Sequence, residues 1–280
     1  MPPLVSVICL CYNHERFVRD ALQSVIDQTY SPIELIVVDD FSRDRSAEII
    51  RNFVAHHPEV TFIQLPANMG NCRAFNRGLA ITQGKYIIDL AADDVLTQKR
   101  VERGVAVFES NPEIGVQFSD AELMDENGLT TGFHSDKFPH ITIPSGMIFS
   151  DILSRYFINS PTMMMRKSLL DELGGYDESL AYEDFDFWVR STQRTQYKYL
   201  PDPLVKRRVL TSSMGRQQYD TGGIQQQSTF VICKKALALC KEREDFIALK
   251  KRIRYEFRRA VGVGAWGLSW RYLKLWSAVP

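Results

Sequence analysis

The sequence lacks any surplus of charge, because its 280 residues hold 34 Lys and Arg against 34 Asp and Glu. A general nucleic-acid-binding protein needs a basic surplus to displace counterions, so the charge balance argues against this class. The sequence also lacks an apolar run of about 18 residues, the length of a membrane span. Its first residues show neither the basic flank nor the long apolar core of a signal peptide. We therefore expect a cytosolic protein.

Two further patterns are missing. The five cysteines are an odd number and show no zinc-like spacing. Cys9 and Cys11 lie two apart in a predicted strand and so share one face, which predicts small buried apolar residues rather than a disulfide or a metal site. No G-x-G-x-x-G follows the first strand, so the phosphate fingerprint of a dinucleotide-binding Rossmann domain is absent.

Apolar runs and helical periodicities alternate through the first hundred residues, and this pattern predicts an α/β fold with a doubly wound, mostly parallel sheet. Strands are predicted over 4–10, 33–38, 60–65 and 86–91, with a helix after each of the first three. Farther along, the patterns predict a helix over 98–109, a strand over 115–124, an irregular or hairpin excursion over 125–144, a helix over 145–156, a strand over 161–165, a helix over 183–195, a strand over 197–204 and helices from about 228.

The stretch from Lys85 to Leu96 carries the first chemical signal. Its apolar strand delivers two adjacent carboxylates, Asp93 and Asp94, to the loop at the strand end. Ligands of open α/β sheets gather at the carboxyl ends of the strands. Paired Asp side chains are hard oxygen ligands for Mg²⁺ or Mn²⁺, which usually share their remaining positions with substrate phosphates. The alternative is a solvated turn in which Asp94 caps the next helix.

Short motifs recur in a fixed order over roughly residues 4–210. They are Val5-Ser6-Val7-Ile8 with Tyr12-Asn13, Gln28-Thr29, Ile36-Val37-Val38-Asp39-Asp40 with Ser42 and Asp44, Asn68 and Gly70, Asn76-Arg77-Gly78, Gly84, Asp93-Asp94, Gly174-Gly175-Tyr176-Asp177, Glu183-Asp184 and Trp188-Val189-Arg190. This ordered set resembles the inverting GT-A glycosyltransferases of family 2, which move a sugar from a nucleoside diphosphate onto a hydroxyl acceptor.

The resemblance implies a domain organisation. A GT-A domain would cover residues 1–210, with a nucleotide-sugar half over about 1–97 and an acceptor half over about 98–210. A loop and a helical extension would follow over 211–280.

The resemblance also implies a nucleotide site. Asp40 would accept a hydrogen bond from the N3–H of uracil, with Asp39 beside it shaping the loop, and Tyr12 would pack against the nucleoside. Asn68 and Arg77 would line the nucleotide and ribose side. All of these residue types also serve ordinary structural roles, as helix caps, strand-end packing or surface side chains.

For the metal, the resemblance points to Asp94 as ligand to Mn²⁺ or Mg²⁺, while Asp93 would contact the ribose or hold the loop. The chain departs from the family pattern at Ala91, where the family has a further Asp, and no histidine follows the last predicted strand. Metal binding is therefore expected to be weak without the diphosphate. Arg207, Arg208 or Arg216 could neutralise phosphate charge instead, or form a solvated basic loop.

The catalytic base implied by the resemblance is Asp184. An inverting transfer is one in-line displacement in which a carboxylate removes the proton of the acceptor hydroxyl and a metal stabilises the leaving diphosphate. An Asp has a reference pKa of about 3.9 and is ionised at neutral pH, so it needs only position and partial desolvation. The alternative is that Asp184 caps the helix that follows it.

The C-terminal part combines basic residues over 250–259 with tryptophans over 266–276. Such a combination suits a membrane interface, and lipid-linked acceptors of the family lie there. The alternative, which we favour slightly, is that these helices pack on the catalytic domain or on a second copy of the chain. The expected location is therefore the cytosol or the inner face of the membrane, and the oligomeric state is open.

The resemblance therefore implies an inverting, metal-dependent glycosyltransferase with a UDP-sugar as the favoured donor. Its acceptor would be a hydroxyl of a glycan or lipid-linked molecule in cell-surface polysaccharide or glycolipid synthesis. One alternative is a nucleotide-sugar or glycan-binding subunit without catalysis, which Ala91 and the missing histidine keep open. Another is a nucleotidyltransferase, which lacks support because the first strand is followed by Tyr12-Asn13-His14-Glu15 rather than a basic Gly-rich loop.

Overall fold

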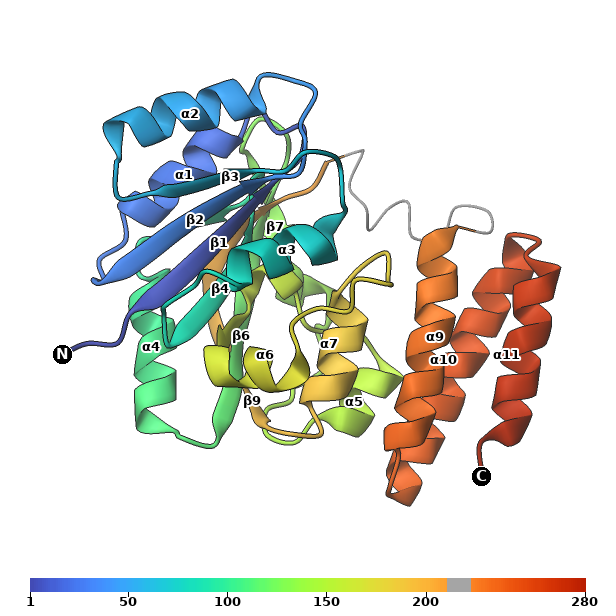
Figure 1. Ribbon diagram of the computed structural model, residues 1–280. Coiled ribbons are helices and arrows are strands. Elements are labelled where there is room, and N and C mark those ends of the chain that lie inside the picture. Colours follow the sequence, from blue (N-terminus) through green and yellow to red (C-terminus); the bar gives the residue numbers. More distant parts are fainter. Residues whose placement is uncertain (211–222) are drawn as a thin grey trace.

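The computed structural model describes residues 1–210 and 223–280. In this part of the chain a nine-stranded sheet has the order β3-β2-β1-β4-β8-β6-β9-β5, and β7 pairs with β6 (Figure 1). The α/β prediction is confirmed.

The first half of the sheet is parallel. Its strands are β1 (Val5–Cys11), β2 (Ile33–Asp39), β3 (Thr61–Gln64) and β4 (Tyr86–Ala91). The helices between them are α1 (Val18–Ile26), α2 (Ser46–His56) and α3 (Asn71–Leu79). Every residue of β1 is buried, as its continuous apolar run predicts for a strand covered on both faces.

The second half of the sheet is mixed. Its strands are β5 (Val95–Leu96), β6 (Ile114–Met124), β7 (Thr130–Phe133), β8 (Met164–Arg166) and β9 (Gln196–Arg208). Strand β8 lies antiparallel between β4 and β6, whereas β9 runs parallel to β6. The helical segments of this half are α4 (Arg100–Ser110), η1 (His134–Lys137), α5 (Phe149–Ser154), η2 (Ser160–Thr162), α6 (Lys167–Leu173) and α7 (Asp184–Ser191).

Three sequence predictions for this half need correction. The strand predicted over 161–165 is mostly the 3₁₀ turn η2, because Pro161 occupies its first turn and leaves only β8 to pair. The helix predicted over 145–156 is reduced to α5. The last strand is longer than predicted, since β9 pairs with β6 as far as Arg208. The excursion over 125–144 contains the β6–β7 hairpin and η1.

Two apolar layers cover the sheet. One contains side chains of α1, α2 and α4, and it also buries Cys9 and Cys11, as predicted. The other contains side chains of α3, α5, α6 and α7.

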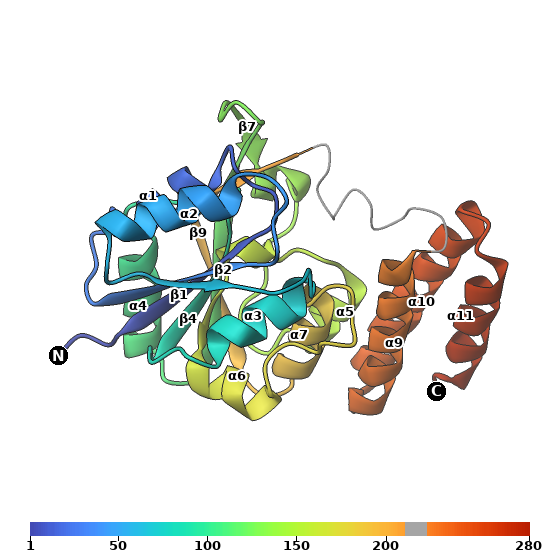
Figure 2. The same ribbon diagram turned by 45° about the horizontal axis from the view of Figure 1, so that its top comes forward.

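The second layer continues without a break into three C-terminal helices, α9 (Ile224–Leu239), α10 (Arg243–Gly262) and α11 (Trp266–Ala278). Helix α9 packs on α7 and α10 packs on α5, while α11 lies outermost (Figures 1 and 2). These helices therefore pack on the preceding α/β domain, as the favoured alternative predicted. None of the helices within 1–210 and 223–280 combines the length and apolar character that a bilayer crossing requires.

Candidate active site

The carboxyl ends of three neighbouring strands define one edge of the sheet. Cys11 at the end of β1 pairs with Asp39 at the end of β2, and Leu10 pairs with Ala91 at the end of β4. Residues that follow these strands therefore meet at the same edge. Tyr12, the first of them, has 39% of its surface exposed, so its ring is free to cover a ligand.

The two carboxylates at the end of β2 make different hydrogen bonds. Both oxygens of Asp40 accept backbone hydrogen bonds, from the N–H of Met69 at 2.6 Å and of Gly70 at 2.9 Å. Burial raises the pKa of Asp40, and these two bonds oppose the rise. Asp39 accepts one bond from the N–H of Ser42 at 3.1 Å, and its Oδ1 is buried without a partner. Asp40 therefore holds the Met69–Gly70 turn, and the fully buried Asp39 keeps one oxygen without a partner.

The capping alternative fails for both carboxylates, because the N-cap of α2 is Arg45. The sequence could not assign the two roles, since Asp40 is engaged by amides that lie 29 and 30 residues farther along the chain.

The structure separates Asn68 from Arg77. Asn68 is exposed in the turn just before the two amides that Asp40 accepts, so it lies at the strand-end edge. Arg77 is exposed in the last turn of α3. Its neighbour Gly78 packs on Ile8, in the middle of β1. Helix α3 thus carries Arg77 away from the edge, and the structure does not bring this residue to the site.

Asp94 is fixed by the last strand. Its side chain is 2% exposed, and its Oδ1 accepts the backbone N–H of Arg208 at 2.8 Å. Burial raises the pKa of Asp94 well above its usual range, the charge of Asp93 adds to the rise, and Arg207 and Arg208 oppose it. Asp94 caps no helix, because α4 begins after Lys99. A carboxylate that is costly to ionise when alone favours a cation beside it.

Arg208 serves as a structural clamp. Its Nε donates to the carbonyl of Asp93 at 3.1 Å, and its Nη1 donates to the carbonyls of Asp125 at 3.1 Å and Glu126 at 3.2 Å. The guanidinium also lies 4.3 Å from the ring centre of Phe17. These contacts fix the loop after β4. Arg208 therefore has a structural role at this site rather than the phosphate-binding role considered from the sequence.

Arg207 is the better placed of the predicted arginines. It is half-buried, and its positive charge lowers the pKa of both Asp94 and Asp184. The guanidinium of Arg207 therefore stabilises the ionised form of both the predicted metal ligand and the predicted base. Arg216 lies outside the described residues.

Asp184 is the first residue of α7, and its Oδ1 is buried without a partner. The N-cap position belongs to Glu183, and no side chain caps this helix, so the capping alternative fails here too. Burial raises the pKa of Asp184, while hydrogen bonds with Glu183 and Ser160 and the charge of Arg207 oppose the rise. A carboxylate with a raised pKa is a stronger base, and its free oxygen can accept a proton.

Glu183 supports this base. Burial, followed by the charges of Asp184 and Asp89, raises the pKa of Glu183 well above its usual range. Its Oε2 accepts a hydrogen bond from Asn71 Nδ2 at 2.7 Å. The side chain of Glu183 is hydrogen-bonded to Asp184, and this contact orients the predicted base.

Asp89 was not predicted to belong to the site. It lies within β4, where Tyr176 Oη donates to its Oδ2 at 3.1 Å. Burial raises the pKa of Asp89 to about 7, and the charge of Asp184 adds to the rise, against the hydrogen bond from Tyr176. Asp89 therefore joins Glu183 and Asp184 in one group of carboxylates. The signal in the sequence was an ionisable residue inside an otherwise apolar strand.

Several residues have buried polar atoms without a hydrogen-bond partner. They include Nδ1 of His14, Oδ1 of Asp39, Oδ1 of Asp184 and both amide atoms of Asn159. Asn159 is only 2% exposed and directly precedes Ser160, which contacts Asp184. Buried polar groups are normally hydrogen-bonded, but such atoms also occur in α4 and α9, at Arg100 and Gln226, so they do not by themselves define a ligand site.

The acidic pair Asp93 and Asp94 fits a metal only in part. In residues 1–210 and 223–280 no group of three or more His, Cys, Asp or Glu side chains is arranged to hold a metal ion. Two carboxylates match the way Mg²⁺ binds beside substrate phosphates, with one or two protein ligands and the rest from substrate and water. The pair therefore fits a cation that arrives with a diphosphate.

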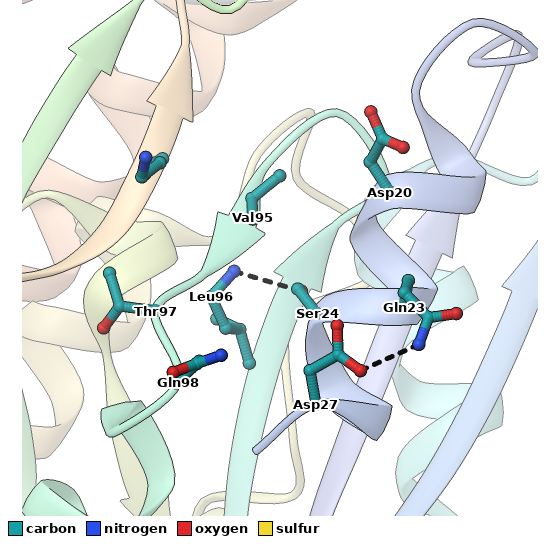
Figure 3. A pocket seen from close by; sticks show the side chains of 9 residues that line it. Asp20, Gln23, Ser24, Asp27, Val95, Leu96, Thr97 and Gln98 are labelled. Atoms are coloured by element: carbon teal, nitrogen blue, oxygen red, sulfur yellow. Dashed lines mark hydrogen bonds between the residues drawn. The ribbon is translucent and has the colours of Figure 1, made fainter. Parts of the chain in front are cut away.

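A separate cavity of about 390 Å³ lies between α1 and β5. Figure 3 shows Asp20 of α1 and Asp27, which follows the helix, on one side and Val95 of β5 on the other. Helix α1 covers the opposite face of the sheet from α7, which carries Asp184. None of the predicted site residues lines this cavity, so it is distinct from the carboxylate group.

The solved structure of S. aureus TarS residues 1–349 in complex with UDP-GlcNAc has the same fold. It superposes with a TM-score of 0.76 at 18% identity, covering 99% of this chain and 81% of the TarS chain. The fold is therefore that of the GT-A glycosyltransferases. The model of the glycosyl transferase family 2 matches residues 6–174, and the chain belongs to this family.

Two relatives extend the comparison. An uncharacterized glycosyltransferase of Methanocaldococcus jannaschii is 33% identical over 192 residues, which are 67% of this chain and 64% of the relative. The poly-beta-1,6-N-acetyl-D-glucosamine synthase of Staphylococcus epidermidis is 26% identical over 203 residues, which are 71% of this chain and 48% of the relative. The chain thus spans less than two thirds of the length of either relative.

Proposed function

We propose that this chain is an inverting, metal-dependent glycosyltransferase that moves a sugar from a UDP-sugar to a hydroxyl of a glycan or lipid-linked acceptor. One observation carries the proposal: the unpartnered Oδ1 of Asp184 is buried in the same site as Asp94 and Arg207. UDP-GlcNAc in TarS and the polysaccharide product of the S. epidermidis relative support this donor and acceptor class. Residues 1–97 would bind the donor and 98–210 the acceptor, with 211–280 as an extension.

For the nucleotide, we assign Asp40 as the acceptor for uracil N3–H, because Asp40 keeps 6% of its surface exposed whereas Asp39 is fully buried. The amides of Met69 and Gly70 each use one acceptor position of an Asp40 oxygen, and each carboxylate oxygen can accept a second hydrogen bond. Tyr12 covers the base from the exposed side, and Asn68 reaches the ribose. Arg77 has no part in this assignment.

The diphosphate would lie near Asp93, Asp94 and Arg207. Asp94, with Asp93, would hold the Mn²⁺ or Mg²⁺ ion, which when bound offsets the negative charge that develops on the leaving oxygen. Arg207 adds a second positive charge on the same side, and Arg208 keeps the loop in place through three carbonyls.

The transfer itself needs one proton acceptor. The acceptor hydroxyl gives its proton to Oδ1 of Asp184 while its oxygen forms a bond to the anomeric carbon. The bond from that carbon to the diphosphate oxygen breaks at the same time, and UDP leaves with the electron pair. One displacement inverts the anomeric centre, so an α-linked donor gives a β-linked product.

The test is the Asp184→Asn variant. Asparagine keeps the shape of Asp184 but cannot take a proton, so transfer should fall by about 10²–10⁴-fold, the typical contribution of a general base. Affinity for UDP should stay within about twofold of wild type, because Asp184 does not contact the nucleotide. The exposed Glu178→Gln variant is the matched control and should keep full activity. Loss of UDP binding in Asp184→Asn, or undiminished transfer, would contradict the assignment.

A second candidate function is a nucleotide-sugar-binding subunit without catalysis. Ala91 at the end of β4 favours it, because this position lacks the carboxylate of the fuller family motif. It predicts that UDP binds to wild type and to Asp184→Asn alike and that neither protein consumes a UDP-sugar, even when glycan and lipid-linked acceptors are supplied.

A further inference from the structure

Helix α11, the outermost helix of the C-terminal bundle, exposes aromatic side chains on one face. Helix α11 buries Leu268, Tyr272 and Leu275 toward α9 and α10. Its other face exposes Trp266 at 71%, Trp270 at 58%, Leu273 at 44% and Trp276 at 45% of their surface. Figures 1 and 2 both place α11 on the side of the bundle farthest from the sheet.

Helical spacing groups most of this aromatic face into one stripe, since residues 266, 270 and 273 are separated by four and three positions. Monomeric proteins rarely expose a contiguous stripe of this kind without an interaction partner. The stripe is thus an interaction surface.

Cationic side chains border the stripe. The Nζ of Lys274 lies 5.4 Å from the ring centre of Trp270, and the Nζ of Lys250 lies 5.8 Å from that of Trp276. Helix α10 exposes further basic residues beside Tyr255, namely Lys251, Arg254 and Arg258. Tryptophan next to Lys and Arg is the composition of protein segments at a membrane–water interface.

The distribution of charge along the chain is strongly asymmetric. Residues 223–280 contain twelve Lys and Arg against four Asp and Glu, a net charge of +8. Because the whole chain is neutral, the first 222 residues carry a net charge of −8. An anionic surface would attract the C-terminal helices and repel the rest of the chain, which fixes the orientation of the protein on that surface.

We propose that the exposed face of α11 docks onto an anionic lipid surface. Its 13 residues span only about 20 Å at 1.5 Å per residue, too short for a bilayer core of about 30 Å, so the helix lies on the membrane. The tryptophans enter the headgroup region while Lys250 and Lys274 contact anionic headgroups. A second copy of the chain fits the surface less well, because it would bring a segment of the same +8 charge.

Flotation of the full chain with lipid vesicles tests this proposal without any need for activity. Wild type should float with vesicles of phosphatidylcholine and phosphatidylserine at 50 mM NaCl, much less with phosphatidylcholine alone, and less again at 500 mM NaCl. Each basic residue near an anionic surface contributes about fivefold to binding, so Lys250→Gln/Lys274→Gln should weaken it by about 25-fold.

A second variant separates the aromatic contribution from the charge. Trp266→Ser/Trp270→Ser/Leu273→Ser should lose flotation while keeping its melting temperature, because all three side chains are exposed. The control Ile81→Ser/Leu129→Ser removes exposed apolar residues of the catalytic domain and should float like wild type.

Two results would overturn the proposal. One is a wild-type chain that stays with the unbound fraction at 50 mM NaCl, or a tryptophan variant that floats as well as wild type. The other is a wild-type dimer in sedimentation velocity that the tryptophan variant abolishes while neither protein binds vesicles, since the face would then belong to a second copy. Because flotation is independent of transfer, it can fail while the proposed function holds.

Discussion

Replacing Asp89 by Asn should stabilise the folded protein at pH 8 and leave its stability nearly unchanged at pH 4. Asp89 has a pKa of about 7 in the folded chain against 3.8 for an unperturbed Asp, because it is buried near Asp184. Below pH 3.8 the carboxyl is protonated in both the folded and the unfolded chain, so its ionisation does not change the free energy of unfolding. Between pH 3.8 and about 7 the unfolded chain releases the proton and the folded chain keeps it, so stability falls as pH rises.

Above pH 7 the folded chain carries the full free-energy cost of ionising the buried Asp89. A shift of about three pKa units corresponds to about 4 kcal/mol at most. Asparagine is never charged and its carbonyl can still accept from Tyr176, so Asp89→Asn should recover about 1–3 kcal/mol of this at pH 8. For a chain of this size that is a rise in melting temperature of about 2–10 °C.

Thermal unfolding followed by circular dichroism at half-unit steps from pH 4 to pH 8.5 measures this difference. The Asp20→Asn variant, at an exposed position of α1, is the control, and its melting temperature should differ from wild type by the same small amount throughout. An Asp89→Asn effect that does not change with pH, or that destabilises more at pH 8 than at pH 4, would refute the reasoning. It would mean that Asp89 is ionised and paired in the folded chain.

Two further predictions concern the framework of the site. Lys235→Met removes the ion pairs that join α9 to Asp177 at 2.5 Å and to the fully buried Asp186 at 2.6 Å. The substitution should lower the free energy of unfolding by about 2–4 kcal/mol, as measured by urea titration. A loss below about 1 kcal/mol would show that these ion pairs contribute little to stability. Gly84→Ala places a Cβ 2.5 Å from the backbone N of Ser6 and should cost about 1–3 kcal/mol. Gly262→Ala, which meets nothing within 4 Å, should leave the melting temperature unchanged or slightly higher, and equal losses in the two variants would contradict the packing argument.

The first half of the fold was predictable because its signals are local. Val5–Cys11 and Tyr86–Ala91 are mostly apolar on both faces, and the helices between such strands have regular apolar periodicity. A parallel sheet then follows from connectivity alone. The same reasoning predicted that Asp93 and Asp94 stand at a strand end.

The second half depends on contacts that the sequence does not show. Strand β8 has three residues and exists because β4 and β6 pair with it on either side. Its sequence, rich in methionine and preceded by Pro161, has no strand periodicity long enough to fix its limits.

The different hydrogen bonds of Asp39 and Asp40 could not be predicted from the sequence either. Two identical neighbouring carboxylates are distinguished only by the Met69 and Gly70 amides, which α3 brings to one of them. The group of Asp89, Glu183 and Asp184 likewise joins β4 to α7 across about 95 residues of chain. In both cases the decisive hydrogen bonds and burial are tertiary.

The proposed function depends on a donor site in which the strand-end carboxylates bind UDP together with a divalent cation. Isothermal titration of the chain with UDP, with and without Mn²⁺, measures this binding directly when wild type is compared with Asp94→Asn and Asp40→Asn. We expect Mn²⁺ to strengthen UDP binding to wild type by at least tenfold, Asp94→Asn to lose this gain, and Asp40→Asn to weaken binding with and without the metal. No UDP binding by wild type under either condition, or a metal gain that survives in Asp94→Asn, would contradict the proposed donor site.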